Sequence, residues 1–126
     1  VHPEKKILAV CGDGGFMMNC QEFETALRAK TPFVTLVFND SSYGLIKWKQ
    51  MDQYGKSCCV DFTNPDFVKF AESMGAIGYR ITKAEDLVPT LKKAFEQNVP
   101  VIIDCPVDYA ENTKLTAHLK ELMEKL

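Results

Sequence analysis

The sequence has 126 residues, of which 46% are hydrophobic, and it carries a formal net charge of -2. This length and composition suit one α/β domain with a real core, and the near-neutral charge excludes the basic patch that nucleic-acid binding requires. No apolar run approaches the roughly 20 residues needed to cross a bilayer, and no leader-like segment opens the chain. We therefore expect a cytoplasmic protein that binds neither nucleic acid nor membrane. Its five cysteines have no paired spacing, which predicts reduced thiols.

The first half of the chain alternates apolar runs with helical periods. Runs at residues 7–11 and 33–38 are rich in β-branched side chains, which predicts two buried strands. Between the two strands, one amphipathic helix is predicted by apolar residues spaced four, three and four apart, namely Phe16, Cys20, Phe23 and Leu27. A second helix is expected after the second strand, over residues 43–54.

The next stretch contains a helix with clear boundary signals. Asn64 is placed to cap its N-terminus, Pro65 suits the first turn, and Gly75 follows its last apolar residue. A weaker strand is expected over residues 76–81. Together these features predict a helix followed by a short strand.

The last part of the chain begins with a possible capping box. Thr82 and Glu85 have capping-box spacing ahead of an apolar helical face, and Pro89 inside that helix predicts a kink. A buried strand is predicted over residues 99–105. The tail over residues 112–126 is expected to be a polar helix whose leucines contact another domain.

The order of these elements predicts the fold class. Helices and strands alternate, so we expect an α/β fold with a parallel sheet and helices on both faces, like half of a flavodoxin-type domain. Only four strands are predicted, and the first follows the chain start almost directly. Since a doubly wound sheet usually has more strands, we expect a domain truncated on its N-terminal side, within a longer polypeptide.

Two polar motifs follow the first two predicted strands. Residues 12–15 read Gly-Asp-Gly-Gly and residues 39–42 read Asn-Asp-Ser-Ser. The glycines let a backbone approach an anion at the start of a helix, and a right-handed crossover brings both motifs to one sheet edge. Asp13 and Asp40 then suit Mg²⁺, which prefers carboxylate, phosphate and water oxygens. Each motif alone is a common turn or helix cap, but the pair at this spacing is far more specific.

This pair resembles the signature of thiamine diphosphate (ThDP) enzymes. Beyond the motif, the chain resembles the acetolactate synthases over residues 12–30, 38–50, 60–80 and 101–112. The resemblance implies Mg²⁺ ligands from the side chains of Asp13 and Asp40 and from the main-chain carbonyl of Ser42. It also implies a set of cofactor-binding residues, namely Gly12, Asp13, Gly14, Gly15, Asp40, Ser42, Tyr43, Gly44 and Leu45.

The same resemblance implies a substrate side to the site. Leu45 and Ile46 would approach the thiazolium and the substrate, although ordinary core packing explains them equally well, and packing is the simpler interpretation of Trp48. Lys49 is also expected near the substrate, and it stands where catabolic relatives tend to have Gln and biosynthetic ones Trp, which leaves the acceptor substrate open. Asp40 replaces the commoner Asn but keeps an oxygen ligand.

The resemblance further implies what the whole protein does. Residues 1–126 would be the C-terminal part of the diphosphate- and Mg²⁺-binding domain, in a parent that condenses two pyruvates to 2-acetolactate and CO2. The activating glutamate is expected on another domain, so this chain would hold no catalytic residue and would be inactive alone. A homo-oligomer is expected, and FAD is possible in the parent. The alternatives are another ThDP-dependent 2-oxo acid decarboxylase or carboligase, and a non-catalytic binding module.

Two aspartates near the end of the last predicted strand have a simpler interpretation. Asp104 and Asp108 flank Pro106. Such residues commonly form turns or caps, and we expect that role for both.

Overall fold

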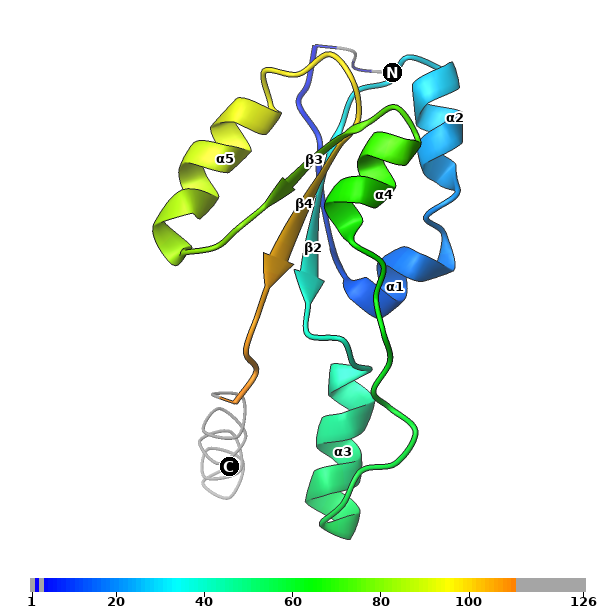
Figure 1. Ribbon diagram of the computed structural model, residues 1–126, viewed down its shortest axis with the longest axis vertical. Coiled ribbons are helices and arrows are strands. Elements are labelled where there is room, and N and C mark those ends of the chain that lie inside the picture. Colours follow the sequence, from blue (N-terminus) through cyan, green and yellow to red (C-terminus); the bar gives the residue numbers. More distant parts are fainter. Residues whose placement is uncertain (1, 3, 111–126) are drawn as a thin grey trace.

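The computed structural model describes residue 2 and residues 4–110, and the predicted tail helix over residues 112–126 lies outside them. Four strands form one sheet in the order β1-β2-β4-β3, and all neighbours are parallel (Figure 1). The strands are β1 (Leu8–Gly12), β2 (Val34–Asn39), β3 (Ile77–Arg80) and β4 (Val101–Pro106). The helices are α1 (Asp13–Met18), α2 (Glu22–Arg28), α3 (Gly44–Tyr54), α4 (Phe67–Ser73), the 3-10 turn η1 (Ala84–Asp86) and α5 (Leu87–Ala94).

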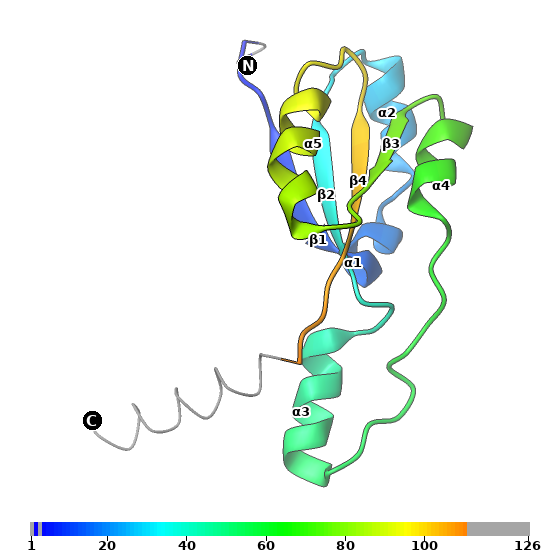
Figure 2. The ribbon, with the colours of Figure 1, turned by 60° about the vertical axis from the view of Figure 1, so that its left-hand side comes forward.

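Helices cover both faces of this sheet, as the sequence predicts (Figure 2). Successive residues of a strand point to opposite faces, so Val37 and Ile102 join one cluster while Leu36 and Ile103 join the other. The first cluster also takes residues from α1, α2 and α4, and the second takes Ala94 from α5. The central strand β4 is therefore buried on both sides, and the predicted α/β parallel fold is confirmed.

The predicted helix between the first two strands is wrong in one respect. The chain forms two helices, α1 and α2, because Asn19 leaves helical geometry at φ -137° and ψ 25° and its N–H bonds to the Phe16 carbonyl. The apolar stripe nevertheless stays continuous, since the rings of Phe16 and Phe23 pack edge to face at 5.7 Å. Periodicity thus identified the buried residues but not the break.

The predicted cap of α4 is also wrong. Asp66, not Asn64, caps this helix, because its Oδ1 accepts hydrogen bonds from the N–H groups of Val68 (3.1 Å) and Lys69 (3.3 Å). Pro65 lies before the helix. At the other end Gly75 adopts φ +85°, the left-handed conformation typical of a residue that follows a helix. The side chain of Asn64 is therefore available for another role.

The kink predicted at Pro89 does not form. After η1, helix α5 begins at Leu87, so Pro89 lies in the first turn, where its missing N–H has no intrahelical partner to lose. The capping box is absent as well, because the Thr82 hydroxyl donates to the carboxylate of Asp86 at 3.0 Å. No backbone N–H is capped by a side chain at this helix start.

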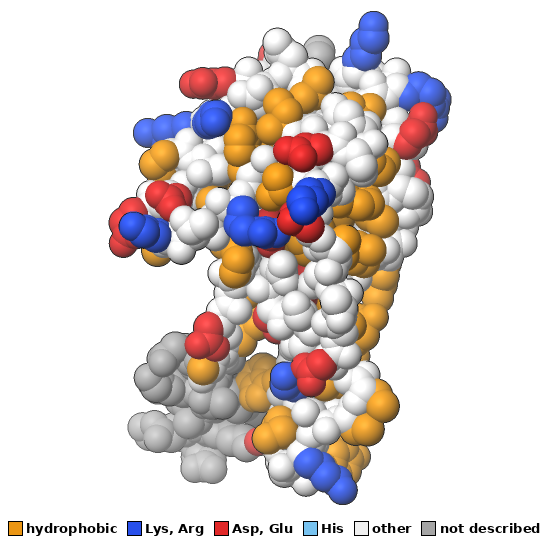
Figure 3. All heavy atoms as spheres, viewed as in Figure 1, with side chains coloured by type: hydrophobic (Ala, Val, Ile, Leu, Met, Phe, Trp, Pro, Cys, Tyr) orange, Lys and Arg blue, Asp and Glu red, His pale blue; other side chains and the backbone are white. Residues whose placement is uncertain are grey.

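Two parts of the molecule lack cover. Strand β1 is a sheet edge, and Ile7, directly before it, and Val10 within it are more than half exposed. Helix α3 projects past the carboxyl ends of the strands and buries none of its residues (Figures 1 and 2). Hydrophobic side chains accordingly reach the surface around α3 (Figure 3).

Within the described residues no helix combines the length and apolarity needed to cross a membrane. All five cysteines are free, as predicted.

Candidate functional site

The two polar motifs meet at one edge of the sheet, as the sequence predicts. Strands β1 and β2 pair in parallel with Gly12 opposite Phe38, so Asp13 and Asp40 follow the ends of neighbouring strands. They border a cavity of about 900 Å³. Its lining contains every predicted cofactor-binding residue, namely Gly12, Asp13, Gly14, Gly15, Asp40, Ser42, Tyr43, Gly44 and Leu45.

Asp13 is the buried carboxylate of this edge, with 1% of its surface exposed. Its Oδ1 accepts a hydrogen bond from the N–H of Gly14 at 2.8 Å. Its Oδ2 accepts two hydrogen bonds, from the N–H of Ser41 at 2.7 Å and from Nδ2 of Asn64 at 2.6 Å. Three donors therefore compensate the burial of this charge and hold the carboxylate in place.

Asp40 organises the loop that follows β2. Its carboxylate accepts hydrogen bonds from the Ser42 hydroxyl at 2.9 Å and the Ser42 N–H at 3.3 Å. Ser41 between them has φ +54°, an uncommon conformation for a residue other than glycine. In this conformation the N–H of Ser41 donates a hydrogen bond to Asp13, and the carbonyl of Ser41 accepts one from the N–H of Phe62. The tight turn thus connects both motifs to the segment before α4.

The glycines of the first motif have different surroundings. A Cβ on Gly14 would lie 2.9 Å from Cε1 of Tyr43, so this ring can cover the motif only because residue 14 is glycine. A Cβ on Gly12 or Gly15 would meet nothing within 4 Å. The predicted diphosphate contacts are at Gly14 and Gly15, and of these two only Gly15 has open space beside its backbone, whereas the Tyr43 ring lies against Gly14.

Helix α3 forms the apolar wall of the cavity. Leu45 and Ile46 line it and are 63% and 52% exposed, so neither packs in the core that the described residues form. Trp48 and Met51 line it as well. Lys49, predicted to approach the substrate, is exposed and does not belong to the lining. Of the three residues predicted on the substrate side, Leu45 and Ile46 therefore line the cavity and Lys49 does not.

Several residues at the site were not predicted from the sequence. Asn64 was interpreted as a helix cap, but it contacts Asp13 and also donates to Oδ1 of Asn39 at 3.0 Å. Tyr109 lines the cavity, and partial burial, followed by the charges of Asp40 and Asp13, raises the pKa of its hydroxyl. The sequence did contain a signal that Asn64 has a role other than capping, because Asp66, directly before the helix, is itself a good cap and makes a second cap unnecessary.

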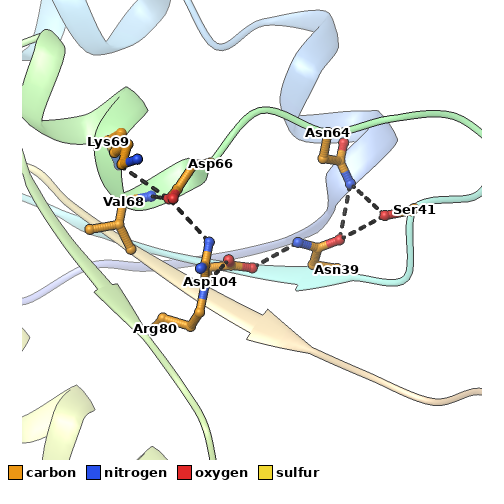
Figure 4. Close-up of polar contacts among 8 residues, drawn as sticks. All are labelled: Asn39, Ser41, Asn64, Asp66, Val68, Lys69, Arg80 and Asp104. Atoms are coloured by element: carbon orange, nitrogen blue, oxygen red, sulfur yellow. Dashed lines mark hydrogen bonds and ion pairs between the residues drawn. The ribbon is translucent and has the colours of Figure 1, made fainter.

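Asp104 differs most from its predicted role. It lies within β4, is 1% exposed, and its carboxylate accepts from Nδ2 of Asn39 at 2.9 Å and from Nε of Arg80 at 2.8 Å (Figure 4). The hydrogen bond to Asp104 raises the pKa of Arg80. Arg80 also pairs with Asp66 at 3.1 Å, and the pKa of Asp66 is lowered chiefly by the N–H of Lys69. Asp104 is therefore an internal anchor, that is, a buried acceptor that connects Asn39 of β2 to Arg80 of β3.

The predicted turn role of Asp108 is confirmed. Its Oδ1 accepts a hydrogen bond from the N–H of Ala110 at 2.8 Å.

The residues at the sheet edge fit a Mg²⁺-diphosphate group. Across residue 2 and residues 4–110, no three side chains of His, Cys, Asp or Glu gather as a metal-binding cluster. Three carboxylates line the cavity, Asp13, Asp40 and Asp108, and the first two, together with Ser42, follow the carboxyl ends of β1 and β2. This donor set suits Mg²⁺, which commonly takes one or two carboxylates and fills its other positions with phosphate oxygens and water.

Comparison with known proteins agrees with this arrangement. Residues 1–105 match the family model described as thiamine pyrophosphate enzyme, C-terminal TPP binding domain. The chain is 44% identical to the acetolactate synthase of Bacillus subtilis (strain 168) over 117 residues, which cover 93% of this chain and 20% of that protein. It is 34% identical to the catabolic acetolactate synthase of Raoultella terrigena over 98% of this chain and 22% of that protein.

A solved structure shares the fold. It is the thiamine diphosphate-dependent 4-hydroxybenzoylformate decarboxylase of Rhodococcus jostii RHA1, with a TM-score of 0.78 and 25% identity. The match covers 86% of this chain and 21% of that one. The chain thus spans about a fifth of the length of the curated relatives that it matches. It belongs to the thiamine pyrophosphate (thiamine diphosphate) enzymes, and its residues 1–105 correspond to their C-terminal TPP-binding domain.

Proposed function

We propose that this chain is the diphosphate- and Mg²⁺-binding part of an acetolactate synthase. The observation that supports this most is the meeting of two motifs, residues 12–15 and residues 39–42, at one edge of a 900 Å³ cavity. The similarity to acetolactate synthases over most of the chain supports the reaction class. Residues 1–126 would then form the C-terminal part of this domain in a longer protein.

The roles proposed for the residues are those that the resemblance to thiamine diphosphate enzymes implies. Asp13, Asp40 and the main-chain carbonyl of Ser42 would hold Mg²⁺, and the backbone at Gly14 and Gly15 would contact the diphosphate. Tyr43 and Gly44 would lie along the diphosphate at the start of α3. When bound, ThDP supplies the chemistry that releases CO2 from a 2-oxo acid and joins the remaining carbons to a second carbonyl.

The apolar wall would act on the organic part of the bound molecules. Leu45 and Ile46 line the cavity with their side chains largely exposed, so burial against a thiazolium or substrate would remove apolar surface from water. A cavity with an apolar wall also excludes water from the reacting groups. The protein thus contributes position and a low-polarity surface, and the cofactor contributes the chemistry.

The remaining catalytic parts belong elsewhere in this proposal. An activating glutamate would come from a pyrimidine-binding domain, and the complete site would form in a cytoplasmic homo-oligomer with pyruvate as substrate. A FAD site, if the parent has one, would lie on another domain. We therefore expect the 126-residue chain alone to show no turnover of pyruvate and only weak ThDP binding.

The test is an assay of the full-length protein with pyruvate, ThDP and Mg²⁺. We expect 2-acetolactate and CO2 as products. Acetaldehyde, or no product at all, would contradict the acetolactate synthase proposal. Turnover by the isolated chain would contradict the proposed division of the site between domains.

A second candidate is a ThDP-dependent decarboxylase of bulkier 2-oxo acids. It is favoured by the apolar wall that Leu45, Ile46 and Trp48 form along the cavity, and by the fold shared with a 4-hydroxybenzoylformate decarboxylase. Competition between pyruvate and benzoylformate separates the two, because each candidate predicts a higher kcat/KM for its own substrate. Binding of ThDP without turnover of either substrate would favour a non-catalytic module.

A further inference from the structure

We propose that Asn64 is a positioning residue for Asp13, and that its amide occupies one carboxylate oxygen so that the other is left for a cation. The inference rests on the proposed function, since it assigns the residue that orients the predicted Mg²⁺ ligand. Asn64 comes from the segment before α4, far from both motifs in the sequence. Its Nδ2 lies 2.6 Å from Oδ2 of Asp13.

The orientation of the Asn64 amide is determined by carboxylates at the two ends of a hydrogen-bond chain. Asp104 accepts only, so Asn39 must turn its Nδ2 toward Asp104, at 2.9 Å. The Oδ1 of Asn39 then faces Asn64 and accepts from its Nδ2 at 3.0 Å (Figure 4). At the other end the carboxylate of Asp13 also accepts only. Both neighbours therefore require the donor side of the Asn64 amide.

Arg80 anchors the far end of this chain. Its guanidinium contains only donors and contacts Asp104 at 2.8 Å and Asp66 at 3.1 Å. Asp66 in turn caps α4, two residues after Asn64. The segment that contains Asn64 is thus attached to β3 and β4 as well as to the site, so its amide cannot reorient independently of the sheet.

The hydrogen bonds of Asp13 leave its two oxygens unequal. Oδ2 accepts from the Ser41 N–H and from Asn64, which together use both of its lone-pair directions. Oδ1 accepts from the N–H of Gly14 at 2.8 Å and, within residue 2 and residues 4–110, from no other group. One lone-pair direction of Oδ1 therefore stays available for a cation.

Two observations oppose a purely structural role for Asn64. The helix that follows is capped by Asp66, so Asn64 is not needed there. The Oδ1 of Asn64 is buried and has no hydrogen-bond partner among the described residues. Buried amide oxygens normally accept a hydrogen bond. The Asn64 amide is instead oriented so that its Nδ2 donates, and its Oδ1 is left without a partner among the described residues.

The test is a calorimetric titration of Mg²⁺ into the full-length protein at saturating ThDP. Asn64→Leu keeps the approximate shape and removes the donor, and we expect it to raise the Kd for Mg²⁺ about ten- to a hundredfold, as for altered residues around a metal ligand. Saturating Mg²⁺ should restore kcat, because every ligand is still present. Thr63→Ala, at the exposed neighbouring position, is the matched control and should leave the Kd within about twofold of the parent value.

The alternative outcomes are distinguishable. If Asn64→Leu lowers the thermal unfolding temperature but leaves the Kd for Mg²⁺ unchanged, Asn64 is only structural and the inference is wrong. If Asn64→Leu does not fold, Asn64→Ala removes the same donor without adding an apolar group to the network, and the same expectation applies. If the parent protein itself binds no ThDP with Mg²⁺, the proposed function fails and this inference fails with it.

Discussion

The two sides of the cavity are built in opposite ways. On the polar side Asp13 is 1% exposed, and hydrogen bonds through Asn64 and Asn39 connect it to Asp104, which lies behind the cavity and is equally buried. On the apolar side α3 buries none of its residues, and Leu45 is 63% exposed. The polar side is therefore held in place by hydrogen bonds among the described residues, whereas the apolar side gains packing only from groups that enter the cavity or cover α3. Substitutions on the two sides should consequently differ in kind.

The largest effect is expected from Asp13→Ala, which removes the buried carboxylate of the polar side. Among residue 2 and residues 4–110, no other carboxylate contacts the donors of Ser41 and Asn64 in its place. We expect Mg²⁺-dependent ThDP binding by the full-length protein to fall by more than about a hundredfold, beyond the effect of residues that only support a ligand. Calorimetry measures it, with Glu85→Ala, an exposed acid outside the cavity lining, as the control. Binding equal to that of the parent would show that the two motifs are not the metal site.

Asp104→Ala tests whether the polar side depends on its internal anchor. It leaves Nε of Arg80 and Nδ2 of Asn39 without their acceptor. We expect the free energy of unfolding to fall by about 2–4 kcal/mol, somewhat below a fully buried pair because the Arg80 side chain is 44% exposed. Urea denaturation checks this, and Asp108→Ala, in an exposed turn, should change it by less than about 0.5 kcal/mol. Equal losses of unfolding free energy from Asp104→Ala and Asp108→Ala would show that Asp104 stabilises the fold no more than a turn residue does.

Asp40→Asn sharpens the comparison within the polar side, because it keeps an oxygen ligand and removes one charge. We expect the affinity for Mg²⁺ or ThDP to fall by about ten- to a hundredfold, less than for Asp13→Ala. A Mg²⁺ titration of the full-length protein measures this difference. A greater loss than for Asp13→Ala would reverse the assigned order of the two ligands.

The smallest effect on stability is expected on the apolar side. Leu45→Ala and Ile46→Ala remove side chains that are more than half exposed, so each should change the free energy of unfolding of the chain by less than about 0.5 kcal/mol. In the full-length enzyme the same substitutions should raise KM for the 2-oxo acid severalfold, since they shorten the wall that faces the cavity. Ala84→Ser, at an exposed position on η1, is the control and should leave both quantities unchanged. A loss of stability above 1 kcal/mol would mean that α3 is packed more tightly than its exposure shows.

Strand and motif positions were predictable because they depend on local features. The β-branched runs predicted strands within two residues of β1, β2 and β4, since burial on both sheet faces requires continuous apolar segments. The meeting of Asp13 with the loop at Asp40 followed from parallel pairing alone. The boundaries at Asn19 and Asp66 were missed because several residues could end or cap each helix, and local sequence does not choose among them.

The amino-acid sequence by itself determined the α/β class, the parallel sheet and the pair of motifs at its edge, because periodicity and turn residues act over short distances. Tertiary structure alone decided the roles of Asn64, Asp104 and Arg80. Each of these side chains is polar and would suit a turn or a surface equally well. Their functions depend on partners 14 to 65 residues away in the chain. Only folding brings such partners within hydrogen-bond distance, and burial then makes each unsatisfied alternative costly.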